Sequence, residues 1–97
     1  NTMASNTQII NNIAEPAKIP IIAGEKGICN GCGIATLSID YYSIGKKAGE
    51  MAYDILVNGK DPADMDIAFD SGPVKEYIKD RCDKLGITVP SDYTAIQ

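Results

Sequence analysis

The sequence predicts an α/β fold built on a parallel sheet, because short apolar segments typical of buried strands alternate with segments of helical periodicity. Its 97 residues are enough for one domain at most. With 44% hydrophobic and 23% charged residues, the composition is that of an ordinary globular protein. A disordered or fibrous chain is therefore excluded.

The first half of the chain predicts a helix, a strand, a loop and a second strand. A helix over residues 3–15 would carry one apolar face made of Ile9, Ile10 and Ile13 and end at Pro16. Residues 19–22 are a short apolar, β-branched run, which suits a strand buried on both faces of a parallel sheet, and residues 34–39 predict a second strand. Residues 24–33 carry four glycines without any periodicity and predict a loop.

The second half begins with the clearest helix, over residues 42–57, where apolar residues recur at steps of three and four. Gly45 and Gly49 inside it suggest that its backbone lies close to a neighbouring element. Residues 65–70 alternate as in a strand. A last helix is predicted to start at Pro73 and end at Gly86, with one buried face made of Val74, Tyr77, Ile78, Cys82 and Leu85.

Charge and hydropathy exclude several classes of function. The net charge is −4, and the nine basic residues are scattered, so we expect no nucleic-acid partner. The longest apolar runs fall far short of the roughly 20 residues that a membrane span needs. The opening residues show neither a basic nor an apolar leader segment, so no targeting peptide is expected in them.

Cys29 and Cys32 form a C-x-x-C pair with three possible roles. A zinc site would need two more ligands, but the chain holds no histidine and only Cys82 besides. A thioredoxin-like redox role needs the first cysteine at the start of a helix, whereas a strand is predicted after Cys32. We therefore favour a local disulfide or free thiols, with no metal and no cofactor. Without histidine or a Gly-x-Ser-x-Gly segment, we also expect no enzymatic activity.

Asp40 and Tyr41 lie where the second predicted strand meets the long helix. In open α/β sheets ligands bind at the carboxyl ends of strands, and a carboxylate beside aromatic rings can hold an ammonium group. An aspartate before a helix is also a common N-cap, and one of two adjacent tyrosines usually packs into a core. From the residues alone, both roles of Asp40 remain open.

Several segments together resemble the ABC-transporter substrate-binding proteins of the tryptophan- and tyrosine-binding type. The resemblance covers nearly the whole chain: residues 33–45 (GIATLSIDYYSIG), 49–52, 55–56 and 58–65, with residues 1–5, 17–25 and 84–90. More distantly, the order of elements is similar to the C-terminal half of type I periplasmic binding proteins. Cys29, Cys32 and Pro16 depart from the family pattern.

The resemblance implies a parallel-sheet sandwich that forms part of the C-terminal lobe of a two-lobed protein. Residues 1–64 would belong to that lobe, and residues 65–97 would be a hinge strand and a helix that return to a missing N-terminal lobe. The ligand would lie between the lobes. The resemblance places five residues at the strand ends that would contact it: Asn1, Thr2, Glu25, Asp40 and Tyr41.

The implied function is that of the extracytoplasmic solute-binding component of an ABC importer. Its ligand would be an amino acid, with an aromatic one as the leading candidate, and its protein partner an ABC permease. The protein would be periplasmic or lipid-anchored to the outer face of the cell membrane. The alternative is the ligand-sensing effector domain of a lactose-repressor-like transcription regulator, which shares the fold. The apolar face predicted on the last helix further suggests that the isolated chain forms a homodimer.

Overall fold

The computed structural model describes residues 2–97 as two compact units. Unit 1 contains the described residues up to Ser38 together with Val74–Gln97, and unit 2 is Ile39–Pro73. The sheet and four of the helices belong to unit 1, whereas the longest helix belongs to unit 2.

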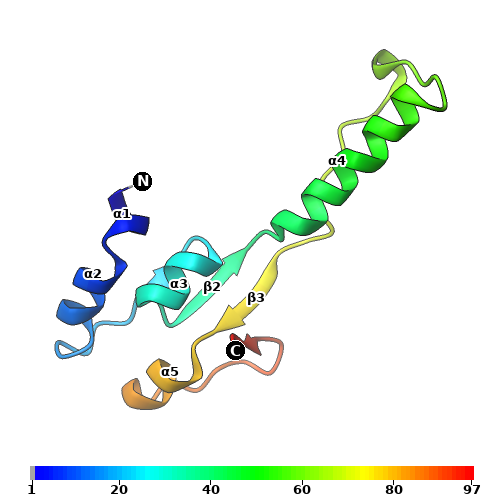
Figure 1. Ribbon diagram of the computed structural model, residues 1–97. Coiled ribbons are helices and arrows are strands. Elements are labelled where there is room, and N and C mark those ends of the chain that lie inside the picture. The colour runs from blue at the N-terminus through cyan, green and yellow to red at the C-terminus, as the bar shows by residue number, and fades with distance from the viewer. Residues whose placement is uncertain (1) are drawn as a thin grey trace. The chain divides into compact units, whose positions relative to one another are not determined.

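Unit 1 is built on a four-stranded sheet in the order β1 (Ile22–Ala23), β2 (Ala35–Ser38), β3 (Val74–Tyr77) and β4 (Thr94–Ala95) (Figure 1). The pairs β1–β2 and β3–β4 are parallel, and β2–β3 is antiparallel. The α/β class is therefore confirmed, but the sheet is mixed rather than parallel throughout. The difference arises at β3, a segment predicted to be the start of a helix.

The two faces of this sheet are covered unequally. Ala23, Thr36 and Ser38 are buried on the face packed by α3 (Lys26–Cys32), where Lys26 Nζ lies 2.7 Å from Glu76 Oε1. On the opposite face, Ile22 and Leu37 remain 69% and 52% exposed. Residues 2–97 thus cover one face of their own sheet and leave apolar side chains open on the other.

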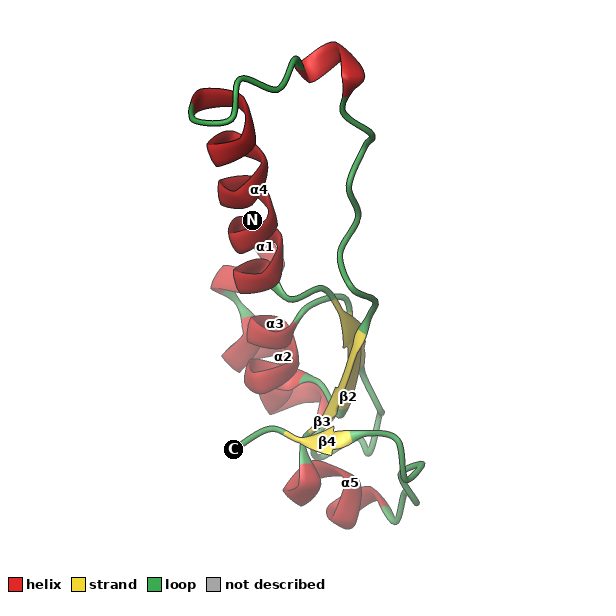
Figure 2. Cartoon of the chain, turned by 90° about the vertical axis from the view of Figure 1, so that its right-hand side faces the viewer, coloured by secondary structure: helices red, strands yellow, loops and turns green. Residues whose placement is uncertain are grey.

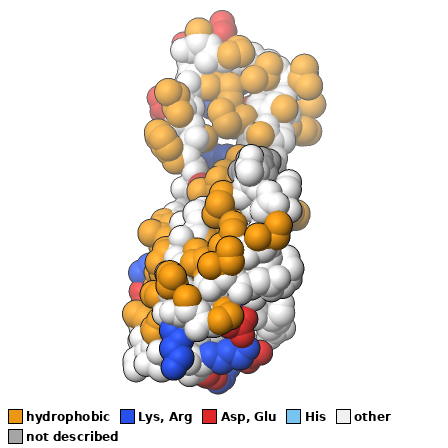
Figure 3. Space-filling view, turned by 90° about the vertical axis from the view of Figure 1, so that its left-hand side faces the viewer, with side chains coloured by type: hydrophobic (Ala, Val, Ile, Leu, Met, Phe, Trp, Pro, Cys, Tyr) orange, Lys and Arg blue, Asp and Glu red, His pale blue; other side chains and the backbone are white. Residues whose placement is uncertain are grey.

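The predicted N-terminal helix is present as two pieces, α1 (Thr2–Ser5) and α2 (Thr7–Ala14). The apolar face predicted on α2 is largely exposed in residues 2–97, with Ile9 and Ile13 58% and 66% exposed. Apolar side chains are accordingly visible over the helices on this side of the molecule (Figure 3). The side of α2 that is buried or half-buried carries Thr7, Ile10, Asn11 and Ala14.

This orientation of α2 follows from a close helix contact. A Cβ added at Gly31 of α3 would lie 2.4 Å from Cβ of Thr7, a distance that only a glycine permits. The two backbones therefore approach at a point where neither helix carries a large side chain.

Helix α3 replaces the predicted loop at residues 24–33. Its glycines cost roughly 1 kcal/mol each relative to alanine in a helix interior. The compensation comes from the Glu25 side chain at its start and from Cys29 and Cys32, which are buried on one face at a spacing of three. Both cysteines are free thiols, as is Cys82.

The predicted helix from Pro73 to Gly86 is shorter than expected. Its first part is β3, and α5 covers only Lys79–Leu85. β3 pairs with β2 on one side and β4 on the other, as Figure 2 shows, and this pairing outweighs the helical pattern. Of the five apolar residues predicted on one helix face, Cys82 is buried and the others are half-buried, three of them outside α5.

Unit 2 contains α4 (Tyr41–Leu56) and a 3₁₀ turn, η1 (Pro62–Asp64). The long helix is confirmed within one residue at each end, and Gly59 follows it with a φ of 68°. Residues 65–70 form no strand, contrary to prediction. The close neighbour predicted at Gly45 and Gly49 is also wrong for residues 2–97, because no atom lies within 4 Å of a Cβ built at either position.

Candidate ligand-binding site

The candidate site in unit 2 is built around the first turn of α4. Asp40 is the N-cap residue, with extended backbone, and its Oδ1 accepts a hydrogen bond from the Tyr42 amide at 3.1 Å. Its Oδ2 accepts one from the Ser43 hydroxyl at 2.6 Å. The cap predicted for Asp40 is therefore present, and the adjoining serine fixes the orientation of the carboxylate.

A second carboxylate lies beside the first. Asp70 Oδ2 accepts a hydrogen bond from the Asp40 amide at 3.3 Å, and Asp70 Oδ1 accepts one from the Ser71 amide at 2.7 Å. Residues 30 positions apart thus place two acidic groups at one end of α4. Each carboxylate oxygen has two lone pairs, so a group that already accepts one hydrogen bond can accept another from a ligand.

Each of the two carboxylates has an aromatic residue next to it in the chain, Tyr41 after Asp40 and Phe69 before Asp70. Tyr41 and Phe69 are 67% and 84% exposed. A cavity of about 300 Å³ lies between Ser43–Glu50 of α4 and residues 69–71, and Lys46 and Lys47 contribute to its wall. Asp70 and Phe69 therefore border a cavity with room for a small solute, and Asp40, which does not line it, is joined to it through its hydrogen bond to Asp70.

The remaining predicted site residues belong to unit 1. Glu25 caps α3, where its two carboxylate oxygens accept hydrogen bonds from the amides of Gly27, at 3.0 Å, and Ile28. Thr2 is exposed at the start of α1, and its carbonyl oxygen accepts a hydrogen bond from Asn6 Nδ2 at 2.7 Å. Asn1 lies outside the described residues.

The structure thus joins Asp40 and Tyr41 at one helix start and places Thr2 and Glu25 in the other unit. Ser43 and Asp70 are additions that the sequence reasoning missed. A signal existed for Ser43, because a hydroxyl three residues after an N-cap is at capping distance. The sequence gives no signal for Asp70, because its contact with Asp40 depends on how the residues between them fold.

Two features are absent from residues 2–97. No cluster of three or more cysteine or acidic side chains there could hold a metal ion. In the same residues, no helix combines the length and the apolar character required to cross a membrane.

A family model described as ABC transporter substrate binding protein matches residues 1–95. The chain belongs to this family. Its class is that of binding proteins rather than enzymes, and members act outside the cytoplasm. The resemblance seen in the sequence is therefore confirmed, and the regulator alternative is not favoured.

Individual relatives agree with this assignment. A tyrosine-binding protein of Clostridioides difficile (strain R20291) is 39% identical over 67 residues, which make up 69% of this chain and 19% of that protein. The chain thus spans about a fifth of the length of that curated relative.

Solved structures place the same fold in longer proteins. A ligand-free, open substrate-binding protein with adhesive properties from Clostridium difficile is 34% identical, with a TM-score of 0.79 over 97% of this chain and 32% of that one. An ABC domain from Streptococcus pneumoniae in complex with L-Trp is 26% identical, with a TM-score of 0.76 over 100% of this chain and 35% of that one. A conserved domain protein from Vibrio cholerae, at 23% identity and a TM-score of 0.68, shows the fold alone.

Proposed function

We propose that the protein carrying this chain captures an aromatic amino acid outside the cytoplasm and delivers it to an ABC permease for import. The tyrosine-binding relative and the neighbour in complex with L-Trp support the ligand class. The observation that carries the proposal is the pair Asp40 and Asp70 at the start of α4, beside exposed aromatic rings.

In this proposal the ligand's ammonium group binds to Asp40. The Ser43 hydroxyl and the Tyr42 amide hold the carboxylate in one orientation before the ligand arrives, which reduces the entropy lost on binding. Asp70 adds negative charge at the same point, and the ring of Tyr41 offers an apolar surface to the ligand's side chain.

Thr2, Glu25 and Asn1 are proposed as contacts made by other elements of the same lobe. A missing N-terminal lobe would supply the opposite wall, and closure about a hinge would stabilise the bound state. This lobe alone would then bind weakly, because it offers half of the contacts. We also propose that the full-length protein is anchored to the membrane by a lipid and that the isolated chain forms a homodimer.

The test is Asp40→Asn in the full-length protein. Asparagine can still accept the hydrogen bond from the Tyr42 amide, so the melting temperature should stay near that of the wild type. The negative charge is lost, so calorimetry with tyrosine or tryptophan should show binding weakened about tenfold or more, equivalent to about 1.4 kcal/mol.

Asp61→Asn is the matched control. Asp61 also caps a helical turn of unit 2, through a 2.9 Å hydrogen bond from the Ala63 amide, but the contact with Asp70 belongs to Asp40. The control should bind within about twofold of wild type. Equal affinities for the two variants would show that Asp40 only caps the helix and that the ligand's ammonium group binds elsewhere.

A further inference from the structure

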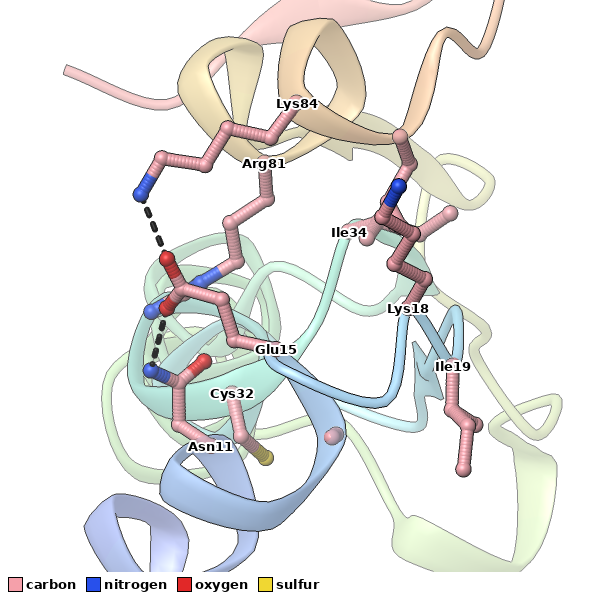
Figure 4. Close-up of a pocket in the computed structure, with 10 residues that line it drawn as sticks. Asn11, Glu15, Lys18, Ile19, Cys32, Ile34, Arg81 and Lys84 are labelled. Atoms are coloured by element: carbon pink, nitrogen blue, oxygen red, sulfur yellow. Dashed lines mark hydrogen bonds and ion pairs between the residues drawn. The ribbon is translucent and has the colours of Figure 1, made fainter.

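Unit 1 contains a second cavity that the proposed amino-acid site does not use. It has a volume of about 230 Å³ and lies between the C-terminal part of α2, the end of α3 and α5 (Figure 4). Glu25 stands at the start of α3 and Cys32, which lines this cavity, at its end. Seven residues of helix separate them by about 10 Å, so the cavity is distinct from any ligand contact at Glu25.

The cavity is apolar with a charged border. Ile19, Ile34 and Leu85 supply its apolar surface, and Lys18, Arg81, Lys84 and Glu15 its charges. Three cations against one anion give the border a surplus of positive charge in a chain whose net charge is −4. An apolar space with a cationic border favours a ligand that has an apolar body and one anionic group.

Two of the three cations are already engaged. Lys84 forms an ion pair with Glu15, and Asn11 donates a hydrogen bond to the same carboxylate at 3.0 Å. The guanidinium of Arg81 donates to four carbonyl oxygens around the end of α3, each at 3.0 Å. Among residues 2–97, Lys18 has no carboxylate within ion-pair distance.

Lys18 also holds an unusual backbone conformation. Its φ is 55°, the left-handed region, and it is the one non-glycine residue with a positive φ in the described part of the chain. The Lys18 amide donates to the Glu15 carbonyl and the Ile19 amide to the Ala14 carbonyl, which is the turn that normally places glycine at the Lys18 position. A lysine at this position is less stable than glycine, so its presence calls for a role of the side chain.

Figure 4 shows where that side chain lies. Lys18, Ile19 and Ile34 are on one side of the cavity, and the connected row of Lys84, Glu15 and Asn11 is on the other. A ligand carboxylate beside Lys18 would therefore leave the Lys84–Glu15 pair intact while its apolar body fills the space between the two sides.

We propose that this cavity is a second small-molecule site, which takes a short apolar monocarboxylate with its carboxylate paired to Lys18. The volume corresponds to about eight water-sized groups at about 30 Å³ each, which suits an acid of about six carbons. The site does not depend on the proposed amino-acid binding.

The probe is hexanoate, titrated into full-length protein with labelled isoleucine and leucine methyl groups and followed by NMR. We expect saturable shifts at Ile19, Ile34 and Leu85 and none at Ile67, which belongs to unit 2. Hexan-1-ol should bind at least about fivefold more weakly, because it lacks the charge, and hexylammonium more weakly still. Equal affinity for acid and alcohol, or no saturable shift, would overturn the proposal.

Lys18→Gly separates ligand binding from folding. Glycine suits a φ of 55°, so the variant should unfold at the same temperature as wild type or a higher one. Its affinity for hexanoate should fall about fivefold or more, and that for hexan-1-ol should not change. Lys79→Gln is the control, because Lys79 lies on α5 but does not line the cavity. Unchanged hexanoate affinity in Lys18→Gly would contradict the assignment.

Tyrosine provides the last comparison. If it shifts the same three methyl groups, the cavity is part of the amino-acid site and the proposal of a second site is wrong. If Asp40→Asn loses tyrosine binding but keeps hexanoate binding, the two sites are independent. Failure of tyrosine binding to depend on Asp40 would leave the hexanoate result unaffected, so the two proposals fail separately.

Discussion

Arg81 closes the C-terminal end of α3 by donating a hydrogen bond from Nη2 to the carbonyl oxygen of Gly31 at 3.0 Å. Nη1 reaches the carbonyl oxygens of Cys29, Asn30 and Gly33 at the same distance. The Cys29 carbonyl also accepts a hydrogen bond from the Gly33 amide at 2.8 Å. The last carbonyls of a helix have no partner within it and carry partial negative charge, so the guanidinium supplies both hydrogen bonds and positive charge at this end. A residue about 50 positions away thereby completes a helix rich in glycine.

Replacing Arg81 with lysine should destabilise unit 1. Lysine keeps the charge but not the planar fork that reaches several carbonyls at once, so the free energy of unfolding should fall by about 2 kcal/mol. Urea unfolding followed by circular dichroism measures this. Lys79→Met, on the same helix, removes only an exposed ion pair with Asp83 and should cost less than about 0.5 kcal/mol. An Arg81→Lys variant as stable as Lys79→Met would show that the carbonyls do not need the guanidinium.

Gly31→Ala tests the close approach of α2 and α3. The new Cβ would lie 2.4 Å from both Cβ and Oγ1 of Thr7, so the helices must separate and a loss of about 2 kcal/mol or more is expected. Gly49→Ala in α4 meets no atom within 4 Å and should gain about 1 kcal/mol from helix propensity. Thermal unfolding of both variants in the full-length protein is the measurement. Destabilisation by Gly49→Ala would mean that a neighbour absent from residues 2–97 packs against α4 there.

These contacts explain which elements the sequence predicts well. Helix α4 and strand β2 have clear local signals: a regular apolar period and an aspartate cap for the first, and a β-branched run for the second. Helix α3 has a local cap in Glu25, but its glycines obscure the helical pattern, and part of its support comes from Arg81, far away in the chain. β3 is a strand because β2 and β4 pair with it, and such pairing is not visible in the local pattern.

The same distinction holds for the candidate site. Asp40 is predictable because it stands at the junction of a strand and a helix, where both the cap and the ligand position are local features. Asp70 joins it through a contact across 30 residues, within a segment whose alternating pattern suggests a strand that does not form. In this chain, contacts between polar groups far apart in the sequence therefore could not be predicted from the local pattern.

Thr36→Val should leave the protein as stable as wild type or more stable. The Thr36 side chain is 1% exposed, and its hydroxyl oxygen has no hydrogen-bond partner within the described chain. Valine has nearly the same shape and removes the buried polar group, so a gain of about 1 kcal/mol in unfolding free energy is expected. Ser38→Val on the same strand is a comparison at a second buried hydroxyl. A loss of more than about 1 kcal/mol in Thr36→Val would reveal a partner, such as a buried water molecule.

Cys29 should be nearly inert in the folded protein and should make stability depend on alkaline pH. Its side chain is fully buried, and burial raises its pKa from the ordinary value of 9.0 to about 11. The thiolate is the reactive form of cysteine. Because the pKa rises from 9.0 to about 11, the thiolate population at pH 8 is about 100-fold lower in the folded protein than in the unfolded chain. Iodoacetamide followed by peptide mass spectrometry should show slow labelling of Cys29 in buffer and rapid labelling in urea.

The free energy of unfolding should fall at alkaline pH, because folding raises the pKa of the Cys29 thiol. The folded state favours the neutral thiol, so its contribution is complete below pH 9 and is lost as the pH rises through about 11. Urea unfolding at several pH values should therefore show a decrease between pH 9 and 11 that is smaller in Cys29→Ala, which has no thiol to ionise. Cys29→Ala also removes a buried sulfur, so the two curves are compared by slope rather than height. Parallel slopes in this range would mean that the Cys29 thiol ionises as easily in the folded protein as in the unfolded chain.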